Sequence, residues 1–219
     1  MASSTRDLSP IQRAVIDGLA GSTCFYLTGG AALSAFYLHH RQSNDLDFFV
    51  VNNDELDELE RRMEQLGAER GWSVEEVRRF PGFRRFIVRD GSDETIVDMV
   101  YEPVAQIVPL PDKPIHAGLR VDALEDLVAN KLCALLGRGD VKDLIDLYFL
   151  DRAGVDVLSH IDGARTKDGG IEPLTLSFVL RGMSTDPSRL LLIIPVADDE
   201  LSAFRDRLVQ GLLMLAWPG

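Results

Sequence analysis

The segment from Phe25 to Val50, FYLTGGAALSAFYLHHRQSNDLDFFV, constrains this chain more than any other part of it. Its first residues, Phe25-Tyr26-Leu27, favour a strand, and Gly29-Gly30 interrupts that strand where a helical pattern begins. A glycine pair at this point lets a ligand approach the backbone, and the first N–H groups of a helix favour an anion. The pattern predicts a strand, a phosphate-binding turn and a helix from Ala31 to about His40.

Two carboxylates open the next predicted strand. Asp45 and Asp47 begin the apolar run DLDFFVV. Strand alternation places both on one face, with Cα atoms about 6–7 Å apart. Such a pair can hold one divalent ion, or two ions about 3.5–4 Å apart. A solvated junction between loop and strand is the structural alternative. Because the pair follows a glycine turn, it favours nucleotide chemistry.

The net charge of −12 bears on which partners the chain can bind. It disfavours indiscriminate nucleic-acid binding, so any such contact requires a local basic patch. No apolar run approaches the roughly 20 residues of a membrane span, and the first residues lack the order of a secretory signal. The two cysteines, Cys24 and Cys133, are far apart in sequence. We therefore expect a reduced cytoplasmic protein without a membrane partner.

Turn and capping signals divide the rest of the chain. The α+β pattern predicts a mixed or antiparallel sheet flanked by helices in residues 1–115, and a mainly helical part in residues 116–219. The proline-containing connector 104–119 is the predicted boundary, and the capping pair Asp122 and Glu125 opens the helical part. Strands are predicted at 72–80, 83–89 and 94–101; helices at 10–21, 54–71, 122–136, 140–150, 173–183 and 198–217; a turn at 137–139; and a polar loop at 163–170.

Asp98 is a carboxylate in a predicted strand that is apolar on both faces. Without a partner it would cost several kcal/mol or become neutral. Two explanations are open. An arginine of the neighbouring strand, such as Arg85, could pair with it, or Asp98 could be the third carboxylate of a metal site that includes Asp45 and Asp47.

Lys131 lies on the apolar stripe of its predicted helix. A lysine there usually extends its ammonium group to solvent, but this one could reach a bound triphosphate. The next helix carries Lys142, Asp143 and Asp146 on its narrower polar side. On spacing alone, these three are interpreted as an ordinary solvated face.

A predicted hairpin tip, RRFPGFRRF, is the one credible nucleic-acid surface in this acidic chain. Arg78, Arg79, Arg84 and Arg85 alternate there with three phenylalanines. Arginine can hold phosphates, and aromatic rings can stack on bases. The alternative is an edge hairpin kept soluble by its charges, and the sequence does not decide between the two.

Two motifs together resemble one known family. The first is LTGGAALS, then Tyr37, then HRQSNDLDF (residues 40–48). The second is NKLCAL (residues 130–135), then Arg138, then KDLIDL (residues 142–147). They are similar to the motifs of the AbiEii/AbiGii nucleotidyltransferase family, a branch of the polymerase-β-like superfamily that includes toxins of type IV toxin–antitoxin systems.

The resemblance implies a polymerase-β-like core, a nucleoside triphosphate as substrate and Mg²⁺ (or Mn²⁺) as cofactor. It implies Asp45 and Asp47 as metal ligands and catalytic residues, with Lys131 and an aspartate of the second motif, Asp143 or Asp146, completing the catalytic set. Asp98 is the third metal ligand expected from its place in a buried strand. The expected nucleotide contacts are Thr28, Gly29, Gly30, Arg41, Ser43, Lys131 and Lys142. The superfamily often has Ser or Thr after the glycines. This chain has Ala31, which offers no hydroxyl to a phosphate.

The expected function is transfer of a nucleoside monophosphate to an acceptor hydroxyl. The first acceptor to consider is RNA such as a tRNA end, with the chain as a toxin and an antitoxin as its partner. The helical part is expected to complete the active-site cleft. Alternatives are a small-molecule acceptor such as an aminoglycoside, a protein acceptor, and a non-catalytic binding protein that keeps the fold.

Overall fold

The computed structural model describes residues 7–217, which form two compact units. The first unit comprises the chain up to Val104 together with Val108–Ala123, and the second comprises Ala105–Ile107 together with the chain from Leu124 onward. Residues 116–123, assigned to the helical part in the sequence analysis, therefore belong with the sheet. Val121 explains why, because it forms a parallel bridge to Leu27.

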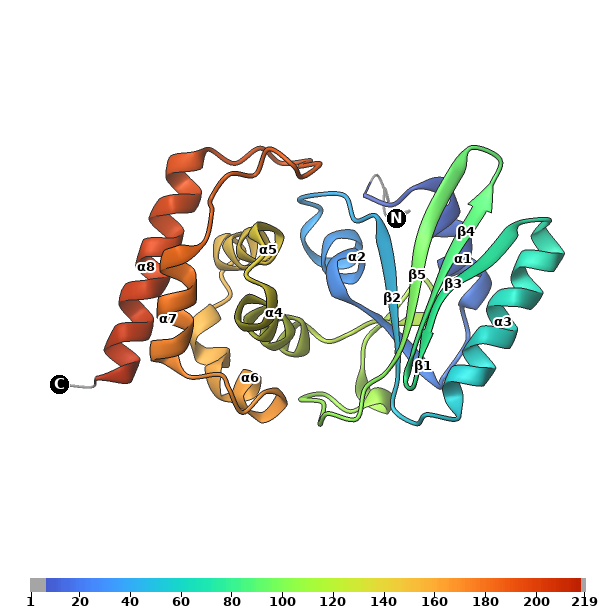
Figure 1. The fold of residues 1–219 in the computed structure, drawn as a ribbon, viewed down its shortest axis with the longest axis horizontal. Coiled ribbons are helices and arrows are strands. Elements are labelled where there is room, and N and C mark those ends of the chain that lie inside the picture. Colours follow the sequence, from blue (N-terminus) through green and yellow to red (C-terminus); the bar gives the residue numbers. More distant parts are fainter. Residues whose placement is uncertain (1–6, 218–219) are drawn as a thin grey trace. The chain divides into compact units, whose positions relative to one another are not determined.

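A five-stranded mixed sheet organises the first unit (Figure 1). Its strand order is β1-β2-β5-β4-β3, with β2 and β5 parallel and the other neighbours antiparallel. The predicted mixed sheet and the antiparallel meander are confirmed. The strands are β1 (Phe25–Thr28), β2 (Asp45–Val50), β3 (Ser73–Phe80), β4 (Phe83–Asp90) and β5 (Asp93–Tyr101), and a small hairpin joins β6 (Ile115–His116) to β7 (Leu119–Arg120).

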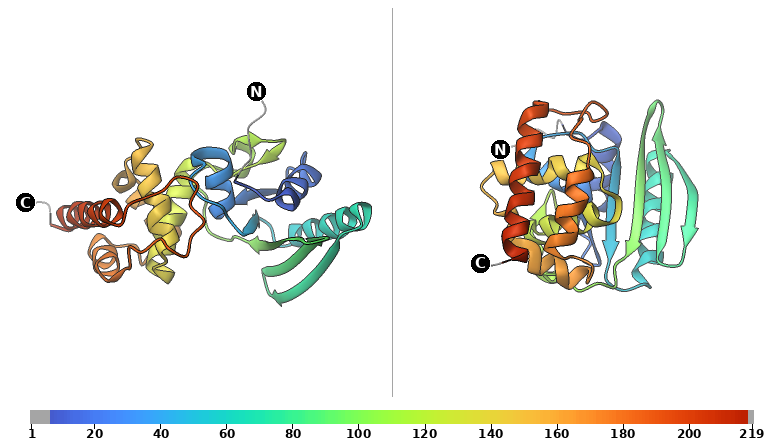
Figure 2. Two further views of the ribbon diagram at one scale, coloured as in Figure 1. Left: turned by 90° about the horizontal axis from the view of Figure 1, so that it is seen from above. Right: turned by 60° about the vertical axis from the view of Figure 1, so that its left-hand side comes forward.

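One face of this sheet forms the core of the first unit. Leu46, Phe48 and Val50 alternate along β2 and are fully buried. Helices α1 (Pro10–Leu19) and α3 (Glu55–Arg70) cover this face (Figure 2). Because side chains alternate between the two faces, Asp45 and Asp47 lie on the opposite face of β2.

The helix after the glycine pair is shorter and less regular than predicted. It begins two residues earlier as α2 (Gly29–Leu33) and continues as a π-helical segment, Ser34–Leu38. His39 ends it in the left-handed conformation, with φ at 54°. The chain then turns back and enters β2 beside β1, which brings the polar segment 41–44 close to the glycine pair.

A buried ion pair fixes the end of β1. The Lys113 ammonium group lies 2.6 Å from Asp122 Oδ1, and the Thr28 hydroxyl donates a 2.6 Å hydrogen bond to Asp122 Oδ2. Both charged side chains are almost completely buried, and the ammonium group lies 4.5 Å from the centre of the Tyr26 ring. Asp122, predicted to begin a helix, thus anchors the residue that precedes the glycine pair.

The second unit is helical, as predicted (Figure 1). Its helices are α4 (Leu124–Arg138), α5 (Val141–Arg152), α6 (Ile161–Lys167), α7 (Pro173–Gly182) and α8 (Asp198–Ala216). Two details of the prediction are wrong. The turn at 137–139 begins later, because α4 continues through Arg138. Much of the predicted loop 163–170 is helical, because Ala164 is buried and Lys167 pairs with Asp126 of α4 at 2.7 Å.

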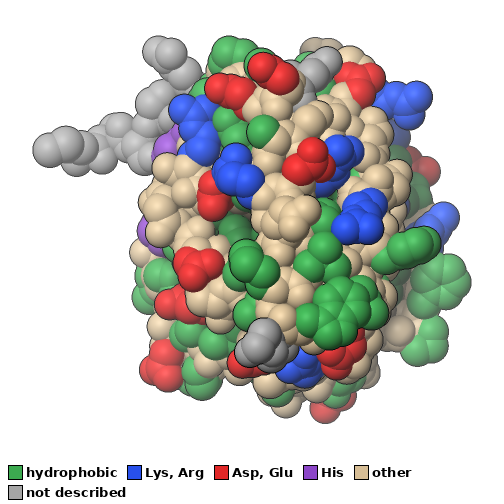
Figure 3. Space-filling model, turned by 90° about the vertical axis from the view of Figure 1, so that its left-hand side faces the viewer, with side chains coloured by type: hydrophobic (Ala, Val, Ile, Leu, Met, Phe, Trp, Pro, Cys, Tyr) green, Lys and Arg blue, Asp and Glu red, His purple; other side chains and the backbone are tan. Residues whose placement is uncertain are grey.

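The paired helices α7 and α8 expose apolar side chains, among them Phe178 and Met214, and Trp217, which follows α8, is exposed as well. Figure 3 shows green side chains interspersed with charged ones on this side of the molecule. Within residues 7–217, no helix combines the length and the apolar character needed to cross a membrane.

The Lys113–Asp122 pair gives a stability prediction. Lys113→Met leaves the buried Asp122 carboxylate without this ammonium group, which should cost about 3–5 kcal/mol of unfolding free energy. Urea denaturation followed by circular dichroism measures the loss. Arg61→Met is the control, because that side chain is 69% exposed and its loss should cost no more than about 0.5 kcal/mol. Equal stability of the two variants would contradict a structural role for the pair.

Candidate active site

The glycine pair and the polar residues of segment 41–47 lie next to one another in the first unit. Gly29 has φ at 71°, and a Cβ atom built on it would collide with Asp47 Oδ2. A Cβ on Gly30 would lie 2.6 Å from Arg41 Nη2 and 2.9 Å from Ser43 Oγ. Each glycine therefore makes room for polar groups that the sequence analysis assigned to a site, Asp47 to metal binding and Arg41 and Ser43 to nucleotide binding.

Hydrogen bonds order this cluster from within. Ser43 Oγ donates a 2.9 Å hydrogen bond to Asp45 Oδ1, so it orients the first carboxylate of β2. Arg41 is almost fully buried, and its Nη1 donates to the carbonyl of Gln42 at 3.0 Å. The Thr28 hydroxyl donates to Asp122, which makes Thr28 an anchor of the turn. Ala31 is fully buried in α2.

The three carboxylates predicted to bind metal, Asp45, Asp47 and Asp98, lie on one face of the sheet. Asp47 of β2 is in register with Asp98 of β5, and Asp45 lies two residues before Asp47. We call this side the carboxylate face. Arg85 of β4 is in register with Asp98 and donates two hydrogen bonds to it, of 2.7 Å from Nε and 2.6 Å from Nη2.

Arg85 supplies the arginine partner that the sequence offered as one explanation of Asp98. Its pKa is raised, first by the hydrogen bonds to Asp98 and further by the negative charges of Asp98, Asp45 and Asp47. This guanidinium group therefore stays protonated beside all three carboxylates. The role of Asp98 as a third metal ligand stays a prediction.

Asp45 and Asp47 fit a hard divalent ion such as Mg²⁺. Mg²⁺ keeps several waters and is commonly bound by one or two carboxylates together with substrate phosphates. Among residues 7–217, no three His, Cys, Asp or Glu side chains converge as a metal-binding group. Two carboxylates together with phosphate oxygens would supply a donor set of the kind that Mg²⁺ takes.

The second unit holds its own buried charge cluster, formed by α4 and α5. Lys131 Nζ lies 3.1 Å from Asp143 Oδ1 and 2.6 Å from Asp146 Oδ2. Arg138 donates two 2.7 Å hydrogen bonds to Asp143. Asp143 and Asp146 are fully buried, so the solvated face expected from spacing alone is wrong. Lys142 is half-buried and forms no ion pair with the residues that the structure describes.

Two residues that hold the first-unit site were missed in the sequence analysis. Lys113 lies in a proline-containing connector with no periodic pattern, so nothing indicated its burial. Gln12 could have been found, because it stands three residues after the helix-capping Ser9. Its side chain accepts from Ser9 N and donates to Ser43 O at 2.9 Å and to Thr95 Oγ1 at 3.2 Å.

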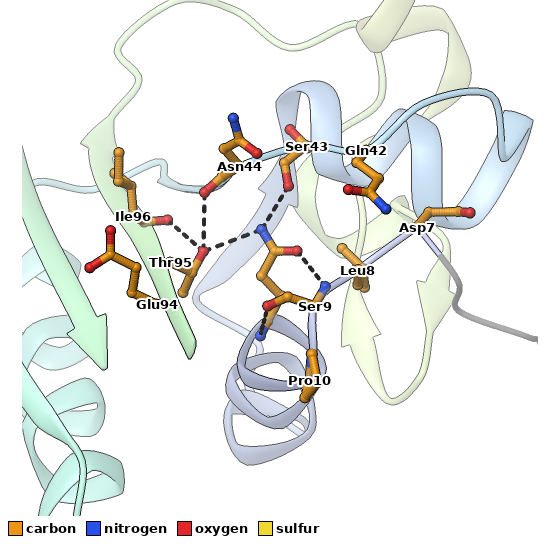
Figure 4. A pocket seen from close by; sticks show the side chains of 11 residues that line it. Asp7, Leu8, Ser9, Pro10, Gln42, Ser43, Asn44, Glu94, Thr95 and Ile96 are labelled. Carbon is orange, nitrogen blue, oxygen red and sulfur yellow. Dashed lines mark hydrogen bonds between the residues drawn. The ribbon is translucent and has the colours of Figure 1, made fainter. Parts of the chain in front are cut away.

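A cavity of about 630 Å³ adjoins the start of β2. Figure 4 shows Ser43, Asn44 and Thr95 around it, with the Asn44 carbonyl accepting from Thr95 Oγ1 at 3.3 Å. Asp7 and Glu94 contribute acidic groups to its lining. This volume falls within the range of small-molecule sites.

The sheet order and the glycine turn beside paired carboxylates define a protein of the nucleotidyltransferase class. The family model described as "Nucleotidyl transferase AbiEii toxin, Type IV TA system" matches residues 17–217. The chain belongs to this family, as the two sequence motifs implied.

Solved structures share this fold. MenT4, a nucleotidyltransferase toxin of Mycobacterium tuberculosis H37Rv, has a TM-score of 0.68 at 20% identity and covers 93% of this chain and 82% of its own. JHP933 from Helicobacter pylori has a TM-score of 0.57 at 22% identity, with 93% and 91% covered. An uncharacterized protein of Aquifex aeolicus (strain VF5), aq_aa25, is 29% identical over 130 residues. That match spans 58% of this chain and 58% of the Aquifex aeolicus protein.

The contact between Gly29 and Asp47 can be tested against a matched glycine. Gly71 has φ at 72° and open space around its missing Cβ. Alanine at either position is strained by about 1–2 kcal/mol in the left-handed conformation, but Gly29→Ala must also displace Asp47. We expect Gly29→Ala to lose more unfolding free energy in urea titrations than Gly71→Ala. Equal losses would show that Asp47 does not need the space.

Proposed function

We propose that this chain catalyses metal-dependent transfer of a nucleoside monophosphate from a nucleoside triphosphate to an acceptor hydroxyl. The observation that carries the proposal is the close approach of Asp47 to Gly29, which joins a phosphate-binding turn to a carboxylate pair. Membership of the AbiEii family supports the same reaction. The acceptor oxygen bonds to the α-phosphorus, pyrophosphate leaves, and the acceptor proton passes to a base or to solvent.

In the first unit, each side chain of the cluster has a proposed task. Asp45 and Asp47 would hold the divalent ion, and Ser43 fixes the Asp45 carboxylate through its 2.9 Å hydrogen bond. The bound ion would supply positive charge to the phosphoryl oxygens during transfer. Arg41, whose guanidinium group lies against Gly30, is suited to a phosphate of the same nucleotide.

In the second unit, we propose that the Lys131 cluster serves the same reaction. Lys131 would contact the triphosphate, Lys142 would add a second cationic contact, and Asp143 or Asp146 would act near the acceptor. The ion pairs of Lys131 with both aspartates hold its ammonium group in one place. Positioning of this kind raises reaction rates because the charged group needs no reorganisation during transfer.

RNA is the proposed acceptor, and toxicity through that RNA is the proposed cellular role. The type IV toxin–antitoxin description of the family supports an antitoxin partner for this chain. MenT4, which shares the fold, is itself described as a nucleotidyltransferase toxin. The arginine hairpin offers a surface of suitable chemistry for RNA phosphates.

A small-molecule acceptor is the second candidate, favoured by the cavity beside β2. Asp7 contacts His39 Nδ1, whereas Glu94 pairs with Arg89 at 3.1 Å and stays 64% exposed, so its carboxylate suits a cationic, hydroxyl-rich molecule such as an aminoglycoside. This candidate keeps Asp45 and Asp47 in the same roles and changes only the acceptor. Glu94→Gln should then reduce label transfer to an aminoglycoside and leave label transfer to RNA unchanged.

The reaction is tested with α-³²P-labelled nucleoside triphosphates, Mg²⁺ and total RNA. Asp47→Asn should reduce label transfer by roughly 1,000-fold, because several kcal/mol of charge stabilisation are lost with the ion. Asp54→Asn, an exposed aspartate before α3, is the matched control and should transfer label normally. Full transfer by Asp47→Asn would overturn the site assignment.

The distribution of label separates the other outcomes. Label in the small-molecule fraction with none in RNA would support the second candidate. If no fraction is labelled and calorimetry finds no binding of Mg²⁺–nucleotide, the chain is a non-catalytic protein that keeps the fold.

A further inference from the structure

The β3–β4 hairpin sorts its four arginines onto two faces of the sheet. Arg79 and Arg84 are in register with each other, and so are Arg78 and Arg85. Arg84 is also in register with Met99, which is fully buried on the face covered by α1 and α3. Because neighbouring residues of a strand point to opposite faces, Arg78 and Arg85 belong to the carboxylate face.

Arg79 and Arg84 lie on the face that α1 and α3 cover, and carboxylates neutralise both of them. Arg84 forms ion pairs with Asp57 and Glu60 of α3. Arg79 pairs with Glu60 and with Glu76. Three carboxylates thus compensate two arginines, so this side of the hairpin offers little attraction to a polyanion.

The pair on the carboxylate face keeps donors for a ligand. Arg85 uses Nε and Nη2 on Asp98, and its side chain is 34% exposed. Arg78 is exposed, forms no ion pair with the residues that the structure describes, and places its guanidinium group 6.0 Å from the centre of the Phe80 ring.

Two aromatic rings stand beside these arginines on the same face. Phe80 lies two residues after Arg78, Phe83 lies two residues before Arg85, and the two phenylalanines are in register. Their ring centres are 6.4 Å apart, and Phe80 is 58% exposed. Arg85 lies 5.7 Å from the centre of the Phe83 ring. An exposed phenylalanine beside an arginine that has no ion pair is unfavourable at the edge of a sheet unless a ligand covers it.

Strand register joins this surface to the metal-binding carboxylates. One row crosses the sheet from Asp47 through Asp98 and Arg85 to Arg78. Neighbouring strands are about 4.8 Å apart, so the row spans about 14 Å. The charge along this row changes from negative at Asp47 to positive at Arg78. A site that holds a metal ion at one end and a phosphate at the other requires such a change.

We propose that Arg78, Phe80, Phe83 and Arg85 form a platform that binds the acceptor as a single-stranded nucleic acid. The arginines hold its phosphates, the rings stack on its bases, and the row directs its terminal hydroxyl toward Asp45 and Asp47. The proposal rests on the function proposed above. It assigns no nucleic-acid contact to Arg79 and Arg84, which the sequence had grouped with the other two.

The test measures binding of a short fluorescent single-stranded RNA to the full chain by anisotropy, over a range of salt. Arg78→Gln should weaken binding and lower the slope of log affinity against log salt by about 0.7, the value for one lost phosphate contact. Phe80→Ala should weaken binding by roughly 5- to 100-fold through lost stacking, with the slope unchanged. Arg79→Gln is the matched control, since Arg79 is the sequence neighbour of Arg78 and is also exposed, but lies on the other face.

Equal effects of Arg78→Gln and Arg79→Gln, or no effect of Arg78→Gln and Phe80→Ala, would overturn the platform. Loss of Mg²⁺–nucleotide affinity in Arg78→Gln with RNA binding retained would also overturn it, because the phosphate held would then be that of the nucleotide. Binding requires no turnover, so the two proposals fail separately. RNA binding without label transfer would sink the catalytic proposal alone, and transfer to a small molecule without RNA binding would sink the platform alone.

Discussion

The parallel pairing of β2 with β5, continued by β4 in register, is the constraint on which the rest of the site depends. It places Asp47 beside Asp98 and Asp98 beside Arg85. A shift of one residue in any of these strands would move its charged side chain to the face that α1 and α3 cover. The apolar residues Leu46 and Phe48 prevent such a shift, because they would then face away from the core. The hydrophobic pattern of the sheet therefore fixes the position of its charges.

Buried ion pairs hold both groups of candidate site residues in place. Lys113 and Asp122 anchor the strand end before the glycine pair, and Lys131 joins two aspartates between α4 and α5. A buried pair contributes little net stability, because desolvation offsets the attraction, but the loss of one partner is costly. Such pairs therefore specify geometry more than they stabilise the fold. In this chain they fix the Gly29-Gly30 turn and Lys131, which are both proposed to bind phosphate.

Much of the fold was predictable because its signals are local. Strand alternation in DLDFFVV, the glycine pair and the capping serine at position 9 each act over a few residues. The Lys113–Asp122 pair was not predictable, since it depends on a connector without periodicity. The burial of Asp143 and Asp146 was missed because a polar side of a helix can face solvent or a buried cation, and spacing does not distinguish the two. The four arginines were predicted as one group, and only strand register separates them by face.

Crystals grown with Mn²⁺ and a non-hydrolysable nucleoside triphosphate analogue test the central claim most directly. That claim is that Asp45 and Asp47 hold the catalytic ion together with the nucleotide phosphates. Anomalous scattering locates Mn²⁺ without reference to any assumed mechanism. The account predicts a peak at about 2.0–2.3 Å from carboxylate oxygens of both aspartates, with phosphate oxygens completing the shell. A nucleotide bound with its ion elsewhere, and no peak at Asp45 and Asp47, would contradict it.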